Sequence, residues 1–323
     1  MSDAASVVRW KLLNSPGPIV LSVQSGLGDH ILARSAVRYL TTLRPDVYVR
    51  SSWPQLWDGI LPRDRVLPRL SPLRCQAANE ARFPETWDPP RVDGLALELT
   101  YMDRFADMTA PGSTLTMLEA IASLVGDPAP DCALDVTAFE AEGRRAAAAL
   151  SLDVDAPFLI GRYPTVRSEW FCSSRNPAPG LIAAALAGAR RNDEPVLSVA
   201  WVEAEAEEFV EADRPATHRA ELGELSIEAY IWLLARARVV VSSVCNPTLV
   251  TPAVGGSVFS VFGGAVPPAT IFDPRLGPGH YGFVAPEPFC ACFDPLHACE
   301  KSIPVETVGS MASAFRDLVD ADG

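Results

Sequence analysis

The stretch IVLSVQSGLGDHILARSAVRYL, residues 19–40, contains the three parts that decide the fold. Ile19 to Val23 is a short apolar run of strand length, and a turn containing Gly26 and Gly28 follows it. From Asp29 to Leu43, apolar side chains recur at three- and four-residue spacing, which is typical of an amphipathic helix. A strand, a glycine turn and a helix in this order predict a β-α unit whose turn lets a ligand approach the backbone closely.

The same alternation of strand and helix continues along the chain and predicts parallel sheets. The predicted strands are residues 47–49, 95–99, 158–161, 196–201, 239–243 and 257–262. The predicted helices are residues 113–125, 138–150, 179–191, 203–213, 226–237, a short helix ending at 254, and 305–319.

A chain of 323 residues is longer than an average single domain, so two domains are expected. We place the boundary in the linker at residues 153–157, which gives a first domain over residues 1–155 and a second over residues 156–304. Residues 305–323 are expected to form a C-terminal helix that packs back on the first domain.

Composition limits the class of protein. Apolar residues make up 48% of the chain and charged residues 21%, which predicts a folded globular protein. The apolar runs are too short to span a bilayer and the N-terminus has no signal pattern, so we expect a cytoplasmic protein without membrane insertion. The seven cysteines do not indicate a disulfide framework in such a chain. A net charge of −13 disfavours general binding to nucleic acid.

The glycine turn does not match the common nucleotide-binding motifs. A dinucleotide-binding fingerprint requires a third glycine where Ile31 stands, and a P-loop requires a Gly-Lys-Ser/Thr ending that is absent. An NAD-dependent oxidoreductase is therefore disfavoured.

Three separated stretches resemble, in the same order, the heptosyltransferase family, which is glycosyltransferase family nine. They are Gly26 to Leu40 with Pro45, Leu225 to Gly264, and Phe289 to Pro304 with its cysteines. The resemblance implies the GT-B architecture, which has two Rossmann-like domains with parallel sheets facing a cleft. It also implies that the first domain binds the acceptor and that the second binds a nucleotide-sugar donor.

The chain departs from the family where Val244 and Asn246 to Leu249 replace an acidic residue and a Gly-Pro-Met-His stretch. Residues 162–170 with residues 175–177, and residues 270–275, resemble divergent phage-encoded relatives. Some phage glycosyltransferases modify hydroxymethylated pyrimidines in DNA. The resemblance therefore suggests a 5-hydroxymethylpyrimidine acceptor, such as hydroxymethylcytosine, and activity in the host cytoplasm. The alternative acceptor is a surface saccharide such as lipopolysaccharide core.

Asp29 is the candidate catalytic base. Transfer with inversion requires a base that takes the proton of the acceptor hydroxyl, and the resemblance implies this role for Asp29. At a helix start, the macrodipole favours the ionised carboxylate, and the alternative is an N-terminal capping aspartate. Gly28 and His30 are candidate acceptor-binding residues, and His30 alternatively has no special task.

The candidate donor-binding residues gather after strands of the second domain. Arg162 and Arg167 can grip diphosphate oxygens, or they form surface salt bridges instead. Glu203 can accept a hydrogen bond from the ribose or base, or it is an exposed acid in an acidic helix. Asn246 and Thr248 stand at the start of a short helix, where Thr248 can donate to a phosphate.

Gly263 and Gly264 follow a strand and offer backbone donors for phosphates, or form a plain turn. Separately, Cys290, Cys292, His297 and Cys299 have ligand types that suit a structural zinc ion, or are reduced cysteines without metal.

Together these features predict an inverting glycosyltransferase that uses a nucleoside diphosphate sugar. Because no Asp-x-Asp pair follows a strand, the catalytic step is expected to be metal-independent. An alternative of another class is a nucleotide-sugar binding protein without turnover, as the loss of polar side chains at Val244 and Leu249 suggests.

Overall fold

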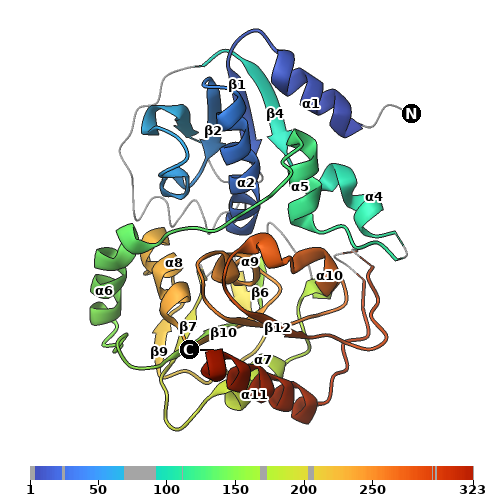
Figure 1. Cartoon of the computed structure of the whole chain (residues 1–323). Helices are drawn as coiled ribbons and strands as arrows, with labels where there is room; N and C mark the ends of the chain where they lie inside the picture. The colour runs from blue at the N-terminus through green and yellow to red at the C-terminus, as the bar shows by residue number, and fades with distance from the viewer. Residues whose placement is uncertain are drawn as a thin grey trace. The chain divides into compact units, whose positions relative to one another are not determined.

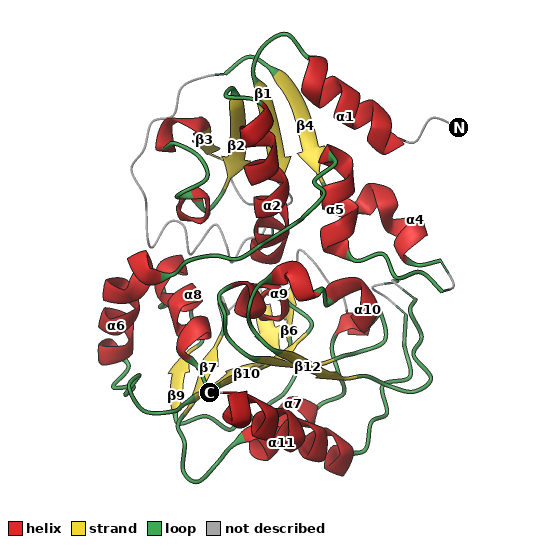
Figure 2. Ribbon diagram, viewed as in Figure 1, coloured by secondary structure: helices red, strands yellow, loops and turns green. Residues whose placement is uncertain are grey.

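The computed structural model describes residues 4–23, 26–68, 92–110, 112–167, 173–202, 207–292, 294 and 297–322. These residues form two compact units, each with its own parallel sheet (Figures 1 and 2). Among the described residues, unit 1 contains the chain up to Cys132 together with Ala269–Leu276, and unit 2 contains Ala133–Pro268 and the chain from Gly277 onward. The predicted α/β class with two parallel sheets is confirmed.

The sheet of unit 1 has four parallel strands in the order β3-β2-β1-β4. The strands are β1 (Ile19–Val23), β2 (Val47–Ser51), β3 (Val66–Pro68) and β4 (Leu95–Leu99). The helices are α1 (Ala4–Asn14), α2 (Leu27–Leu43), α4 (Phe105–Met108) and α5 (Met117–Val125), with 3-10 turns η1 (Pro54–Trp57), η2 (Arg63–Arg65) and η3 (Met102–Arg104). The β1-α2 unit forms as the opening stretch predicts, and α2 is buried on all sides over residues 30–37. Sequence analysis missed α1.

A segment from the second half of the sequence belongs to unit 1. It contains η6 (Pro274–Leu276) and most of α10 (Pro268–Ile271). Thr116, the N-cap of α5, donates a 2.7 Å hydrogen bond to the fully buried carboxylate of Asp273, which also pairs with Arg275. The sequence-based assignment of this segment to the second domain is thus corrected.

The sheet of unit 2 has six parallel strands in the order β12-β11-β10-β5-β7-β9, beside a two-stranded antiparallel ribbon. The sheet strands are β5 (Leu159–Arg162), β7 (Val196–Val199), β9 (His218–Ala220), β10 (Val239–Ser243), β11 (Val258–Val261) and β12 (Tyr281–Val284), and the ribbon strands are β6 (Thr165–Arg167) and β8 (Glu207–Phe209). The helices are α6 (Glu140–Ala149), α7 (Leu181–Ala189), α8 (Ile227–Arg236), α9 (Asn246–Ala253) and α11 (Val305–Asp322), with 3-10 turns η4 (Thr137–Phe139) and η5 (Ser173–Arg175).

Helix α8 confirms the predicted cap, because the Ser226 side chain accepts a 3.2 Å hydrogen bond from the Ala229 amide. The predicted acidic helix over residues 203–213 is wrong in its described part. Residues 207–209 pair as strand β8 with β6, so cross-strand hydrogen bonds replace the helix suggested by the charge pattern. Strands β9 and β12 were not predicted.

Two other expectations about unit 2 need correction. Residues 133–155 group with unit 2 instead of the first domain, and Gly143 shows why. A Cβ atom there would lie 2.2 Å from the Trp232 ring, so the missing side chain lets α6 pack closely on α8.

Helix α11 belongs to unit 2 and packs on α7, so its expected assignment to the first domain is corrected. A Cβ atom at Gly188 would lie 2.1 Å from the Gly309 carbonyl oxygen, so the two backbones come into close contact. The buried faces of both helices join the core of unit 2. Among the helices described, none has the length and apolar character needed to cross a membrane.

Candidate functional site

The carboxyl ends of the parallel strands of unit 2 meet at one edge of the sheet, which is where open α/β sheets bind ligands. Arg162 ends β5, Val244 follows β10, and the glycine pair Gly263-Gly264 follows β11. The fold therefore brings most of the sequence-predicted donor residues to one edge, which we call the donor edge.

Asn246 begins α9 at this edge, and Tyr230 of α8 fixes its side chain. The Tyr230 hydroxyl lies 2.5 Å from Asn246 Oδ1. Burial holds the pKa of Tyr230 well above its ordinary value, so this hydroxyl stays protonated and donates. The amide nitrogen of Asn246 is thereby directed away from Tyr230. The edge of the Trp201 ring packs on Tyr230, with 4.6 Å between ring centroids.

Arg162 is buried, with 4% of its surface exposed. Its guanidinium donates to the Tyr163 carbonyl and, over 3.2 Å, to the Thr165 hydroxyl. Its charge lies near enough to Tyr230 to counter part of the effect of burial on the phenol. Because Arg162 is buried, its positive charge lies in the interior at the donor edge and not on the surface.

Thr248 and Gly264 are engaged inside unit 2. Thr248 is fully buried and its hydroxyl lies 3.1 Å from the Ser260 hydroxyl, so the expected donation from its side chain to a phosphate does not fit this arrangement. The Gly264 amide donates a 2.8 Å hydrogen bond to the Ser174 carbonyl, and a Cβ atom at Gly263 would lie 2.5 Å from the same oxygen. The glycine pair permits close packing, and the amide of Gly264 is not available to a phosphate.

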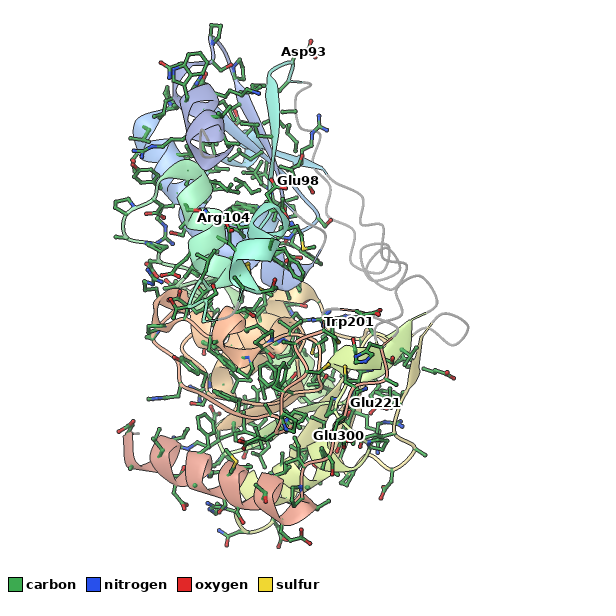
Figure 3. The ribbon with its side chains drawn as sticks, turned by 90° about the vertical axis from the view of Figure 1, so that its right-hand side faces the viewer. Asp93, Glu98, Arg104, Trp201, Glu221 and Glu300 are labelled. Atoms are coloured by element: carbon green, nitrogen blue, oxygen red, sulfur yellow. The ribbon has the colours of Figure 1, made fainter. Side chains whose placement is uncertain are left out.

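Two other predicted donor residues remain untested. Glu203 and the side chain of Arg167 lie outside the described residues. Trp201 forms an isolated antiparallel β-bridge with Leu222, which follows β9. Figure 3 shows Trp201 and Glu221 on the same side of unit 2.

Cys290, Cys292, His297 and Cys299 do come together. One ligand atom from each lies within 4.8 Å of the others. His297 Nδ1 is 3.5 Å from Cys290 Sγ and 3.3 Å from Cys299 Sγ, and the Sγ atoms of Cys292 and Cys299 are 3.1 Å apart. Three sulfurs and one imidazole nitrogen at these distances fit a tetrahedral site for a metal ion such as zinc.

The two neighbouring thiols of this cluster differ in acidity. Burial raises the pKa of Cys292, but hydrogen bonds from Cys299 and other neighbours outweigh burial and lower the pKa. Burial and the neighbouring Cys292 raise the pKa of Cys299 to about 12. The lowered pKa favours the thiolate of Cys292, which is the form that a metal ion binds.

Asp29 lies in the first turn of α2 in unit 1 and is half-buried. Its Oδ2 accepts a 3.0 Å hydrogen bond from the Gly26 amide, so the capping role considered in sequence analysis is present. A Cβ atom at Gly26 would lie 2.5 Å from this oxygen, which explains the glycine at that position. Gly28, the second residue of the same helix, is buried. The carboxylate is held in one orientation and is not enclosed in the core.

His30 is fully buried. Its Nδ1 lies 2.9 Å from the Gly26 carbonyl, and its ring packs edge-on against Trp53 with 4.8 Å between centroids. The expected direct contact between His30 and an acceptor is not supported by this position, which gives His30 a packing role beside the α2 start.

Sequence analysis did not single out Arg175 and Tyr230 as site residues. Arg175 Nη2 donates a 2.9 Å hydrogen bond to the carbonyl of Val244, the residue that follows β10. Tyr230 gives no local signal because it stands in an ordinary amphipathic helix. Arg175 carries only the weak signal of an Arg-Asn-Pro stretch.

The fold, with one parallel α/β sheet in each of two units, is that of GT-B glycosyltransferase structures. Solved structures of this class that resemble the chain include ADP-heptose lipopolysaccharide heptosyltransferase II from E. coli, with 14% identity, a TM-score of 0.53, and coverage of 94% of this chain and 99% of that one. TibC, an iron-containing dodecameric glycosyltransferase from enterotoxigenic E. coli, is 12% identical, with a TM-score of 0.53 and coverage of 95% and 76%. TibC in complex with ADP-D-β-D-heptose has a TM-score of 0.56.

At these identities the likeness is one of fold. No protein-family model matches the chain, and no curated protein matches it in sequence. The heptosyltransferase-like fold that the motifs indicate is confirmed. Nothing in the similar structures described above supports a DNA acceptor or a phage relationship, so the hydroxymethylpyrimidine expectation gains no support.

Proposed function

We propose that the chain is an inverting glycosyltransferase that moves a sugar from a nucleoside diphosphate sugar to a hydroxyl of a saccharide. The observation that carries this proposal is the likeness over nearly the whole chain to heptosyltransferases, including one bound to ADP-D-β-D-heptose. A saccharide acceptor agrees with the lipopolysaccharide heptosyltransferase among these relatives and with the net charge of −13, which repels nucleic acid.

The diphosphate of the donor binds at the donor edge of unit 2. There the start of α9 presents the positive end of the helix dipole, while Pro247 carries no N–H and the Thr248 amide donates to the Cys245 carbonyl. The Asn246 amide donates to a phosphate oxygen, and the buried charge of Arg162 stabilises the negative charge that develops on the leaving diphosphate.

Asp29 is the base. Its orientation is fixed by the Gly26 amide, and it accepts the proton of the acceptor hydroxyl as that oxygen attacks the anomeric carbon. The bond between the anomeric carbon and the diphosphate breaks as the new bond forms, and the diphosphate leaves with the bonding electrons. The metal ion that the cysteine cluster suits has a structural role, and zinc is the ion that three thiolates and one imidazole favour.

The test combines donor binding with transfer. Binding of ADP, UDP and their sugar conjugates is measured by calorimetry, and transfer is assayed with core oligosaccharide and with hydroxymethylated duplex DNA. We expect binding of one nucleotide class and a product with the oligosaccharide. A product with DNA alone would overturn the saccharide acceptor, and absence of binding by any nucleoside diphosphate would overturn the proposal as a whole.

Asp29→Asn should leave donor binding intact and reduce transfer by roughly 10²- to 10⁴-fold, the usual contribution of a general base. The matched control is Asp58→Asn, an aspartate of unit 1 whose side chain is 67% exposed. It should transfer at the wild-type rate. Wild-type transfer in Asp29→Asn would remove Asp29 from the mechanism.

A second candidate function is nucleotide-sugar binding without turnover. It is favoured by the internal use of Thr248 and of the Gly264 amide, which leaves fewer donors for the phosphates. Saturable donor binding with neither hydrolysis nor transfer, over a broad set of acceptors, would support it.

A further inference from the structure

The segment that carries the four metal-binding residues has little regular structure of its own. Between Ala285 and Pro304, none of the described residues lies in a helix or strand. Three cysteine sulfurs and one imidazole nitrogen from ten residues of chain nevertheless lie within 4.8 Å of one another. A loop without the backbone hydrogen bonds of a helix or strand loses much conformational entropy when it is held in such an arrangement. A bound metal ion would offset this loss and fix the loop.

The cluster packs directly on the turn after β11. A Cβ atom at Gly264 would lie 2.3 Å from Cys299 Cβ and 2.7 Å from Cys299 Sγ. Cys292 Sγ is 4.0 Å from the Gly264 carbonyl oxygen. Any side chain at position 264 would therefore push the cluster away from the turn.

The same assembly holds the 3-10 turn η5 at two points. The Gly264 amide donates to the Ser174 carbonyl over 2.8 Å, and the Lys301 ammonium, two residues after the last ligand, donates to the Ser173 carbonyl. Arg175, the last residue of η5, donates to the Val244 carbonyl over 2.9 Å. Val244 is followed by Cys245, the N-cap of α9. A continuous set of contacts thus joins the cysteine cluster to the start of the donor-binding helix.

We propose that a metal ion bound by Cys290, Cys292, His297 and Cys299 braces the donor edge. By holding the Gly264 turn and η5, it fixes the β10-α9 junction, so that metal loading sets the affinity for the donor. The inference rests on the proposed function only in its second part, because the bracing of η5 and α9 does not require that the ligand be a nucleotide.

The first measurement is metal content and local order in the purified full-length protein. We expect one zinc or iron ion per chain by mass spectrometry of the elements, and spectroscopy of the loaded protein distinguishes the two ions. Removal of the ion by a chelator should increase amide hydrogen exchange in residues 173–176 and 244–250. The exchange of α5 in unit 1 serves as the internal control. Absence of a bound ion, or unchanged exchange in both segments, would overturn the inference.

The second measurement is affinity for ADP or for whichever nucleoside diphosphate the wild type binds. Cys292→Ser should lose the ion and weaken binding by about tenfold or more. Gly264→Ala keeps all four ligands but separates the turn from Cys299, and it should weaken nucleotide binding to a similar extent. Gly309→Ala is the control, because its Cβ atom would meet only the Ala184 carbonyl at 3.6 Å, which is ordinary contact.

Wild-type nucleotide affinity in both Cys292→Ser and Gly264→Ala would overturn the coupling. If the wild type binds no nucleoside diphosphate, the proposed function fails while the exchange experiment still decides whether the metal braces the edge. The two failures are therefore distinguishable.

Discussion

Replacement of Arg316 tests how the C-terminal helix is held on unit 2. Arg316 of α11 is buried. Its Nη1 donates a 2.7 Å hydrogen bond to Glu194 Oε2, and its Nη2 donates one of 2.7 Å to Glu194 Oε1. Its Nε contacts the Asp320 carboxylate at 2.8 Å. The Glu194 side chain is only 11% exposed, so removing the guanidinium leaves a carboxylate that is largely shielded from water and without its main partner.

Breaking one side of such a buried pair typically costs about 3–5 kcal/mol. Arg316→Met keeps much of the side-chain volume and should therefore destabilise unit 2 by about this amount, which corresponds to a lowering of Tm by roughly 6–20 °C for a unit of this size. The matched control is Arg238→Met. Arg238 pairs with Asp320 over 2.6 Å, but both side chains are about one-third exposed, so the loss should stay below about 1 kcal/mol.

Chemical denaturation followed by circular dichroism measures both changes. The double variant Arg316→Met/Glu194→Leu should be more stable than Arg316→Met alone, because it leaves no unpaired charge in the interior. Two results would refute the reasoning. One is an equal loss of stability in Arg316→Met and Arg238→Met. The other is a double variant whose loss of stability equals the sum of the losses in Arg316→Met and Glu194→Leu alone.

Three further predictions concern acid stability and the two candidate sites. Burial by itself raises the pKa of Glu194, but the hydrogen bonds from Arg316 outweigh it and hold the pKa below its ordinary value of 4.5. The stabilisation from Glu194 is therefore present above that pH and is lost as the pH falls through the lowered pKa of the folded state. The free energy of unfolding of Arg316→Met, measured as a function of pH, should therefore fall less toward acidic pH than that of the wild type. Tyr230→Phe should weaken nucleotide binding, measured by calorimetry, by about tenfold. Because Tyr230 acts by positioning Asn246, the double variant Tyr230→Phe/Asn246→Ala should bind no more weakly than Asn246→Ala alone. Losses of affinity that add in the double variant would contradict this role. Gly26→Ala should displace the Asp29 carboxylate, cost about 0.5–2 kcal/mol of cap stability in thermal melts, and slow transfer, whereas wild-type transfer would argue against Asp29 as base.

Local patterns predicted much of the fold because they depend on neighbouring residues. The apolar run Ile19–Val23 with its glycine turn predicts β1 and α2, and Ser226 predicts the start of α8. The error at residues 207–209 has the opposite cause. Residues 207–209, Glu-Glu-Phe, are too short a stretch to signal a strand, and only pairing with β6 makes them one.

The candidate site shows the same division. The close spacing of Cys290, Cys292, His297 and Cys299 was sufficient to predict that these four side chains come together, because they lie within one short stretch. The roles of Arg162, Thr248 and Gly264 were not predictable, because each is decided by a partner from another part of the chain or by burial.

The sequence by itself determined the two parallel α/β sheets, the start of α2 at the glycine turn, and a heptosyltransferase-like fold, since periodicity, caps and motif order are local properties. Only the tertiary structure decided that residues 269–276 join unit 1, that α11 packs on α7, and that Gly264 supports the cysteine cluster. These outcomes depend on contacts between residues far apart in the chain, and the free energy of such contacts comes from packing and from hydrogen bonds to specific partners, which no local pattern specifies.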